Sequence, residues 1–365
     1  MLSILLSIKK SIMESKIING IQQIGIGVED VHQAWAWYRK NLGMDIKAFE
    51  EAAIAELMLP YTEGKKRPRH AVLAMNLQAG GGFEVWQHTG KTPEKPKFQI
   101  QLGDLGIFAA KQKTKDINKA FSMMKANGVD ILGEIVKAPN QNPHFFIRDP
   151  FGNIFQIVEN DYLLFETPAP TGGVLGAIIG VSDIDASIKV YSDILNYSEV
   201  VYDKTDVFSD FSAIPGGALK ARRILLRSSE KEKGGFSPLY GPSEIELVQV
   251  LDAPVRKIYE NRIWGDPGFI HLCFDVYNIA AIRKECSEKN FPFTVDSENS
   301  FDMGEAAGQF AYISDPDGTP IEFVETHKLP IIKAIGWVIN LQKRDPRKPL
   351  SKFILRLMSF KRVKN

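Results

Sequence analysis

The chain has 365 residues, of which 44% are hydrophobic and 24% are charged. This composition is ordinary for a folded protein and excludes the disordered and collagen-like classes, and no apolar run approaches the roughly 20 residues of a membrane-spanning helix. The formal net charge is only +1, yet residues 328–365 hold eleven Lys/Arg and one acidic residue, so basic charge is concentrated at one end. At roughly 150 residues per domain, the length predicts two domains.

The first 16 residues carry an apolar Leu/Ile cluster. No cation precedes this cluster, and Lys9 and Lys10 interrupt it, so it is shorter than a usual signal sequence and predicts a frayed leader. The two cysteines, Cys273 and Cys286, lie in apolar patterns, which predicts buried reduced thiols rather than a disulfide. These features favour a cytoplasmic location.

An internal repeat divides the chain into two similar halves. Residues 26–30 (Ile-Gly-Val-Glu-Asp) precede Tyr38, and residues 179–183 (Ile-Gly-Val-Ser-Asp) precede Tyr191. The offset between the two copies is constant at 153 residues. Between the halves, residues 167–173 are rich in proline and glycine, which suits an extended linker. We therefore place the boundary near residue 170.

Each half contains two units with the same order of elements: a short strand, then a helix, then about three strands. Each helix is expected to begin after a capping residue, because apolar residues recur at helical spacing from that point. The four capping residues are Asp30, Asp116, Asp183 and Asn278. Strand-like stretches with turn signals lie at residues 71–77, 82–87, 223–226 and 244–250. Asp-Pro-x-Gly sequences at residues 149–152 and 315–318 predict hairpins rather than catalytic chemistry.

The four units, the Val-x-Asp helix entry with a Tyr eight residues after its Asp, and the Asp-Pro-x-Gly hairpin resemble the vicinal-oxygen-chelate superfamily of glyoxalases, bleomycin-resistance proteins and dioxygenases. The resemblance covers residues 17–326. It implies an α+β fold in which four βαβββ modules pair into two half-open eight-stranded cups, with metal ligands on the first and last strands of each unit. We expect a leader (1–16), an N-terminal domain (17–166, modules 17–100 and 101–166), a C-terminal domain (172–328, modules 172–255 and 265–328) and a basic helical tail (329–365).

In the C-terminal cup, strand alternation places three potential ligands on the inward face, because residues two apart share a face of a strand. They are Glu246, His271 and Glu322, at three of the four positions where the resemblance implies metal ligands. The fourth position is Gly176. One imidazole and two carboxylates suit a divalent Mn, Fe, Ni, Co or Zn ion, and Glu322 or Glu246 would serve as the catalytic base. The alternative is a hydrogen-bonded histidine beside two solvated glutamates.

The N-terminal cup offers a weaker set of ligands. The corresponding positions hold Gln23, Glu84, Asp104 and Gln156. Two neutral amides bind a divalent ion weakly, so we expect a degenerate or substrate-shaping cup here. Trp86 and Phe108 share its inward face by alternation, which suits an apolar pocket or a filled core.

The resemblance implies three possible functions. The first is a metal-dependent, glyoxalase-like lyase or isomerase, which moves a proton next to a carbonyl of a small substrate with two adjacent oxygens. The second is an extradiol or 4-hydroxyphenylpyruvate-like dioxygenase, which needs two histidines and one carboxylate around Fe(II). The third is a non-catalytic, antibiotic-type binding protein for small molecules. We favour the first, because His271 is the single aligned histidine and Gly176 stands where a second would be.

Other features concern partners. The basic run at residues 65–70 lacks interleaved aromatic residues, so we expect no binding of nucleic acid. The tail predicts amphipathic helices at residues 331–339 and 353–360, which we expect to dock on the acidic remainder of the chain rather than on an anionic membrane surface. His144 and His327 are expected at the surface. The substrate and the oligomeric state stay open.

Overall fold

The four expected modules are present in the structure, a computed structural model that describes residues 15–229, 233–298, 301–302, 307–332 and 337–364. Residues 1–14 of the expected leader lie outside the described residues. Module 1 comprises β1 (Ile17–Gly27), α2 (Val31–Leu42), β2 (Ile46–Ala55), β3 (Arg67–Met75) and β4 (Gly82–His88). Module 2 comprises β5 (Gly106–Thr114), α3 (Ile117–Ala126), β6 (Asp130–Lys137), β7 (Pro143–Arg148) and β8 (Ile154–Glu159).

Module 3 comprises β9 (Val174–Gly180), α4 (Ile184–Tyr191), β10 (Glu199–Val207), β11 (Lys220–Arg227), α5 (Ser237–Tyr240) and β12 (Glu244–Val250). Module 4 comprises β13 (Gly268–Tyr277), α6 (Ile279–Glu288), β14 (Val295–Asp296), β15 (Phe301–Asp302), β16 (Ala307–Ser314) and β17 (Pro320–Ile332). The tail adds β18 (Trp337–Asn340), α7 (Lys352–Leu357) and the 3-10 turn η4 (Met358–Lys361).

The module helices begin where the sequence predicts, because a side chain satisfies the first backbone amides of each helix. The Asp30 carboxylate accepts hydrogen bonds from two amides in the first turn of α2. The side chains that cap α3, α4 and α6 in the same way are Asp116, Asp183 and Asn278. The apolar faces of these helices are buried in one cluster that also contains residues of both sheets.

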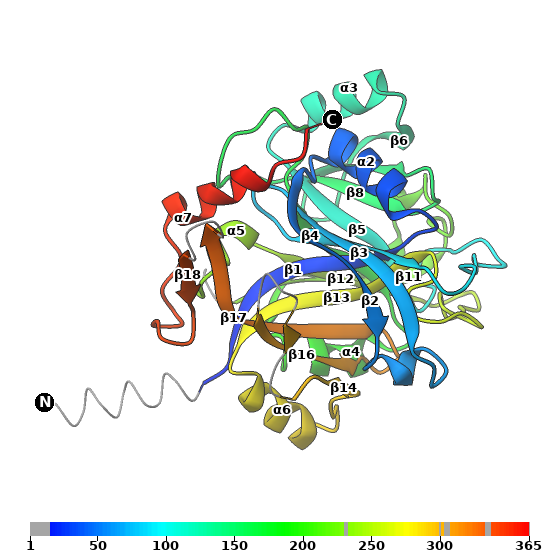
Figure 1. The fold of residues 1–365 in the computed structure, drawn as a ribbon. Helices are drawn as coiled ribbons and strands as arrows, with labels where there is room; N and C mark the ends of the chain where they lie inside the picture. Colours follow the sequence, from blue (N-terminus) through cyan, green and yellow to red (C-terminus); the bar gives the residue numbers. More distant parts are fainter. Residues whose placement is uncertain (1–14, 230–232, 299–300, 303–306, 333–336, 365) are drawn as a thin grey trace, which may run out of the picture.

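The strands form two curved sheets, which are the two half-open cups expected from the resemblance (Figure 1). Sheet A has the order β14-β16-β17-β13-β1-β4-β3-β2, with β15 paired to β16 and β18 paired to β17. Sheet B has the order β10-β11-β12-β9-β5-β8-β7-β6.

The modules pair differently from the expectation that each half of the chain forms its own cup. β1 pairs antiparallel with β13, so module 1 joins module 4 in sheet A, and the two strands run side by side in Figure 1. β5 pairs antiparallel with β9, so module 2 joins module 3 in sheet B. Side-chain alternation specifies the inward face of a strand but not its neighbour, and the pairing that we inferred from chain order was wrong.

The repeated Tyr and Asp-Pro-x-Gly motifs bind each other between the sheets. Tyr38 of α2 donates a hydrogen bond of 2.7 Å to Asp149 in the turn before β8. Tyr191 of α4 donates one of 2.9 Å to Asp315 in the turn before β17. All four residues are buried. Consecutive modules are therefore joined through these turns although they lie in different sheets.

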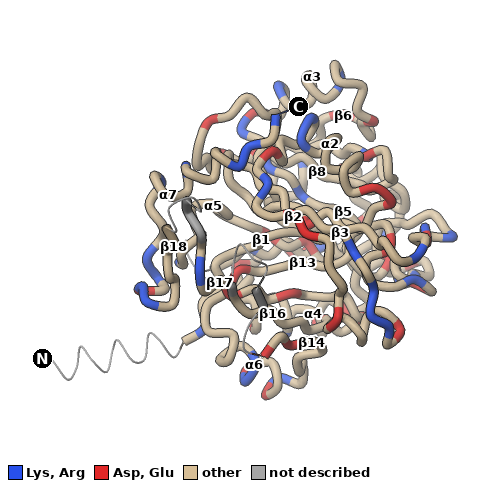
Figure 2. The backbone as a smooth tube through the Cα atoms, viewed as in Figure 1, with Lys and Arg blue, Asp and Glu red and all other residues tan. Residues whose placement is uncertain are grey.

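The basic tail packs on sheet A, and its described Lys and Arg residues are blue in Figure 2. The helix expected at residues 331–339 is wrong, because β17 continues into this segment and β18 pairs with it; residues 333–336 lie outside the described part. Its isoleucines, valine and tryptophan favour a strand. The second expected helix is present as α7, with Leu355 buried, and Arg362 forms a salt bridge of 3.2 Å with Asp45. Within the described residues, no helix is both long and apolar enough to span a membrane.

Candidate metal centre

Four polar side chains meet on the concave face of sheet A, where β17, β13, β1 and β4 lie side by side. In the order of these strands they are Glu322, His271, Gln23 and Glu84. The register explains the convergence, since Gly25 of β1 lies opposite both His271 of β13 and Glu84 of β4. Residues that lie opposite each other share a face of the sheet. The strands are the first and last strands of modules 1 and 4.

Three of these side chains form a compact cluster. His271 Nε2 lies 3.1 Å from Glu322 Oε2 and 3.5 Å from Glu84 Oε2. One ligand atom from each of the three residues lies within 4.8 Å of the others. The Gln23 amide completes the group, because its Nε2 donates to Glu322 at 3.4 Å and to Glu84 at 3.5 Å.

The His271 imidazole is fixed by its surroundings. A Cβ atom on Gly25 would lie 2.4 Å from His271 Cε1, so glycine at this position leaves room for the ring. The Trp264 ring stacks on the imidazole with centroids 5.9 Å apart, and Tyr312 meets it edge-on at 5.6 Å. The buried imidazole therefore keeps one orientation, toward the two carboxylates.

Burial and mutual charge set the electrostatics of the cluster. Burial raises the pKa of Glu84, and the neighbouring His271 only partly opposes this. Burial would lower the pKa of His271, but the negative charges of Glu322 and Glu84 outweigh burial and raise it. Two carboxylates beside one imidazole leave an excess of negative charge. A bound cation would neutralise this charge.

The cluster fits a divalent metal ion. Apart from the two nearby carboxylates, neither ring nitrogen of His271 has a hydrogen-bond partner among the described residues, and Gln23 Oε1 is also buried and without one. Buried polar atoms without a partner are rare and costly, and imidazole, amide and carboxylate atoms are all ligands for divalent ions. A second trio of potential ligands, His32, Glu50 and His70, lies at the surface and outside the cup.

A cavity of about 290 Å³ opens in front of the cluster. Gln23, Glu84 and Glu322 supply its polar base. Its aromatic walls are Phe49, Trp86, Trp264, Phe310 and Tyr312. An apolar cavity of about 150 Å³ is large enough to accept benzene, so this cavity has room for a small organic molecule.

Glu246, which we expected to act with His271, lies in the other cup. Its carboxylate pairs with Arg223 at 2.6 Å and with Lys111 at 3.0 Å, and it accepts a hydrogen bond of 2.7 Å from Tyr202. Burial would raise the pKa of Glu246, but the two cations and the hydrogen bonds hold it far below its usual range. The expected grouping of Glu246 with His271 is therefore wrong, because the two residues belong to different sheets.

The remaining sequence candidates also lie away from the cluster. Gln156 contacts His144 Nδ1 at 3.0 Å in sheet B, where His144 is buried rather than at the surface. Asp104 accepts hydrogen bonds from two backbone amides in the loops beside β5. A Cβ atom on Gly176 would lie 1.8 Å from the Glu244 carbonyl oxygen, so this position serves the close pairing of β9 with β12.

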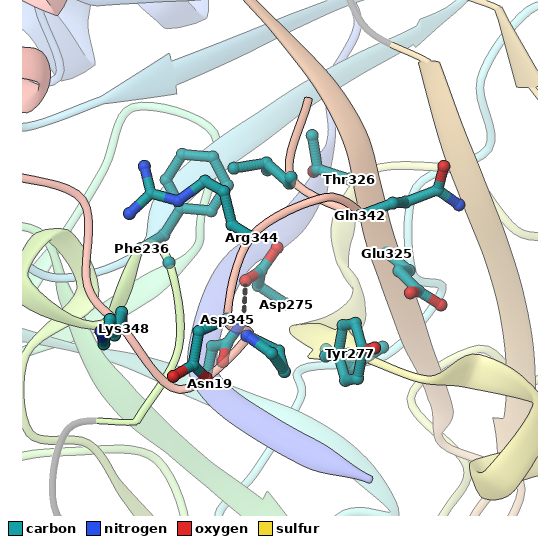
Figure 3. Close-up of a pocket in the computed structure, with 14 residues that line it drawn as sticks. Asn19, Phe236, Asp275, Tyr277, Glu325, Thr326, Gln342, Arg344, Asp345 and Lys348 are labelled. Atoms are coloured by element: carbon teal, nitrogen blue, oxygen red, sulfur yellow. Dashed lines mark hydrogen bonds between the residues drawn. The ribbon is translucent and has the colours of Figure 1, made fainter. Parts of the chain in front are cut away.

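A buried carboxylate lies at the far end of sheet A, in a cavity of about 40 Å³ beneath the tail. Figure 3 shows Asp275 of β13 hydrogen-bonded to Asn19 of β1, with Arg344 and Lys348 of the tail at the sides of the cavity. Burial raises the pKa of Asp275 to about 7, although the hydrogen bond from Asn19 opposes this rise. This pair lies between sheet A and the tail and is separate from the cluster.

A comparison with known protein families shows which superfamily the chain belongs to. A family model for the Glyoxalase/Bleomycin resistance protein/Dioxygenase superfamily matches residues 20–157 and 174–323. The chain belongs to this superfamily. The cluster lies on the first and last strands of modules 1 and 4, whereas the equivalent face of sheet B carries the paired Glu246. Both cysteines, Cys273 and Cys286, are buried and free, as predicted.

Solved structures of the glyoxalase superfamily share the fold. Glyoxalase I from Zea mays is 14% identical with a TM-score of 0.51, over 85% of this chain and 92% of that chain. A putative dioxygenase from Bacillus subtilis subsp. subtilis str. 168 is 12% identical with a TM-score of 0.56, over 85% of this chain and 86% of that chain. No curated protein matches the chain. At these identities the likeness establishes the fold alone.

Proposed function

We propose that this superfamily member is a metal-dependent, glyoxalase-like enzyme, a lyase or isomerase that transfers a proton at a carbon next to a carbonyl. The observation that carries the proposal is the buried convergence of Glu84, His271 and Glu322 at the base of a cavity. With Gln23, these residues would hold a divalent Mn, Fe, Ni, Co or Zn ion. The substrate would be a small molecule with two adjacent oxygen atoms.

A bound divalent ion would supply Lewis acidity toward the two substrate oxygens. The protein supplies the proton transfer. Glu84 on β4 and Glu322 on β17 both lie beside His271 Nε2 and both line the cavity, so a substrate bound there meets the two carboxylates. We assign Glu322 as the general base and Glu84 as the second carboxylate.

Ligand type favours proton transfer over oxygen chemistry. Non-haem Fe(II) oxygenases hold iron with two imidazoles and one carboxylate, whereas the trio at this cluster contains one imidazole. A nearby buried histidine, His88, lies beside Asp266 at 3.9 Å and is not part of the trio. A lyase or isomerase is therefore better supported than a dioxygenase.

The test is to incubate metal-loaded protein with hemithioacetals, 2-oxo acids and catechols in deuterated water, with an oxygen electrode in place. We expect solvent deuterium in a substrate carbon without oxygen uptake. Glu322→Gln should lower the rate of deuterium entry by about 10²–10⁴-fold, the usual contribution of a general base. The matched control is Glu199→Gln, which changes an exposed carboxylate of sheet B and should leave the rate unchanged. Stoichiometric oxygen consumption with a requirement for Fe(II) would replace the proposal with a dioxygenase.

A further inference from the structure

A third cavity, of about 170 Å³, lies beside that of Asp275 and shares Phe236 and Thr326 with it. Its walls come from β2, β3 and α5, and its roof comes from α7 and η4 of the tail. Most of the side chains that line it are apolar, among them Leu73, Met75, Leu239, Leu329, Ile354 and Met358. In Figure 1, α7 lies close to α5 and to the end of β17.

This apolar cavity adjoins the cavity in front of the cluster. Gln22 and Phe49 line both cavities. Leu73 lies in the apolar cavity and is the register partner of Glu84, and residues directly opposite each other have Cβ atoms about 5 Å apart. A molecule bound at the cluster therefore reaches the apolar cavity with a substituent of a few atoms.

The roof is a feature of this chain rather than of the superfamily domain. The family match ends at residue 323, and α7 begins at Lys352. The roof is held down by the buried Leu355 and by a hydrogen bond of 2.9 Å from Lys361 Nζ to the Ala48 carbonyl oxygen. Phe360 lines the cavity and is 79% exposed, so the cavity opens to solvent beside this ring.

From this geometry we propose that the apolar cavity binds an apolar substituent of the substrate, either an unbranched alkyl chain or a single aromatic ring. An apolar cavity of about 150 Å³ accepts benzene, so this one holds a ring or a chain of about six carbons. A polar substituent would lose its hydrogen bonds to water against these walls. The assignment rests on the proposed function, because it takes the substrate oxygens to lie at the cluster.

A series of alkyl hydroxamates tests this assignment, because each offers two adjacent oxygens to the metal and carries a chain of chosen length. Zinc-loaded protein is titrated calorimetrically with acetohydroxamate and its four-, six- and eight-carbon homologues. We expect binding to tighten about fourfold per added methylene, which corresponds to ~0.8 kcal/mol per buried methylene, and to level off beyond about six carbons. An affinity that is independent of chain length would overturn the proposal.

Filling the cavity should remove the dependence on chain length. Ala48→Phe places a ring in the cavity, whereas Ala52→Phe makes the same change at an exposed position of the same strand. The six-carbon hydroxamate should bind Ala48→Phe no more tightly than acetohydroxamate does, and it should bind Ala52→Phe as it binds the unaltered chain. Leu239→Trp fills the same cavity from α5. It replaces Ala48→Phe in this titration if Ala48→Phe does not fold. Equal dependence on chain length in all three variants would contradict the assignment.

A measurement without metal separates this proposal from the proposed function. We expect 1-hexanol to raise the thermal midpoint of the metal-free protein, because a ligand that binds only the folded state stabilises it, and to leave that of Ala48→Phe unchanged. Failure of every hydroxamate together with stabilisation by 1-hexanol would reject the metal centre and retain the cavity. Binding of acetohydroxamate, with no effect of chain length or of 1-hexanol, would reject the cavity and retain the metal centre.

Discussion

Replacing Glu246 by glutamine is expected to destabilise the fold without changing metal binding. Glu246 and its partner Arg223 are both fully buried, and Lys111 lies on the other side of the carboxylate. The substitution preserves the shape of the side chain but removes the charge that neutralises two buried cations. Its effect therefore separates a structural ion-pair network in sheet B from a ligand role.

The expected loss of folding stability lies at the lower end of the range for a broken buried ion pair. Removing one partner of such a pair costs about 3–5 kcal/mol, because a buried charge loses its compensation. Here Arg223 keeps Asp210 at 2.9 Å, and Lys111 keeps its salt bridge to Glu244. We therefore expect the free energy of unfolding to fall by about 3 kcal/mol, a large share of the 5–15 kcal/mol typical of a folded protein.

The assay combines urea unfolding with elemental analysis of the bound metal. Glu84→Gln is the matched comparison, because it makes the same change in the other cup, where no buried cation depends on the carboxylate alone. We expect Glu84→Gln to change the metal-free stability by less than about 1 kcal/mol and to lose the metal. The reverse pattern, with metal lost from Glu246→Gln and retained by Glu84→Gln, would refute the reasoning.

Three further predictions follow from individual contacts. Because the pKa of Asp275 is raised from 3.8 to about 7, the stability that its protonated form contributes is present below pH 4 and is lost as pH rises through 7. Asp275→Asn should match the unaltered chain at pH 4 and exceed its stability by about 2–4 kcal/mol at pH 8 in urea unfolding, and a difference independent of pH would contradict this cause. Tyr191→Phe should cost about 1–3 kcal/mol in the same assay, since it leaves the buried Asp315 without its donor; a loss below about 0.5 kcal/mol would show that the contact is dispensable. Gly25→Ala should weaken metal binding at least about tenfold by displacing His271, whereas Gly235→Ala, which meets open space, should not; calorimetric titration compares them, and equal affinities would oppose the geometry.

Local pattern was sufficient to predict the helices of the four modules and most inward faces of the strands, but not the strand β18 of the tail. Capping residues such as Asp30 and Asp183 marked the helix starts, because a carboxylate that binds free amides acts within one turn. Alternation placed His271, Glu322 and Glu84 on concave faces, because it depends only on the pleat of each strand. The ligand positions were thus predictable one strand at a time.

The grouping of those positions was not predictable from local pattern. The pairing of β1 with β13 joins Ile17 to Tyr277, and a strand with the same alternation can accept either neighbour. Irregular register between Ile107 and Ala109 also changes which residues of β5 face inward, and this brings Lys111 to Glu246. Lys111 and Arg223, two cations within apolar strands, were the signal in the sequence that a carboxylate of sheet B is paired, but their partner Glu246 became clear only in the folded chain.

The metal content of His271→Ala tests the central claim most directly. His271 is the imidazole of the cluster, and without it two carboxylates and an amide remain. We predict about one divalent ion per unaltered chain after loading and dialysis, a similar content in His327→Ala, and no bound ion in His271→Ala. Full occupancy in His271→Ala, or an unaltered chain that binds no divalent ion, would contradict the account.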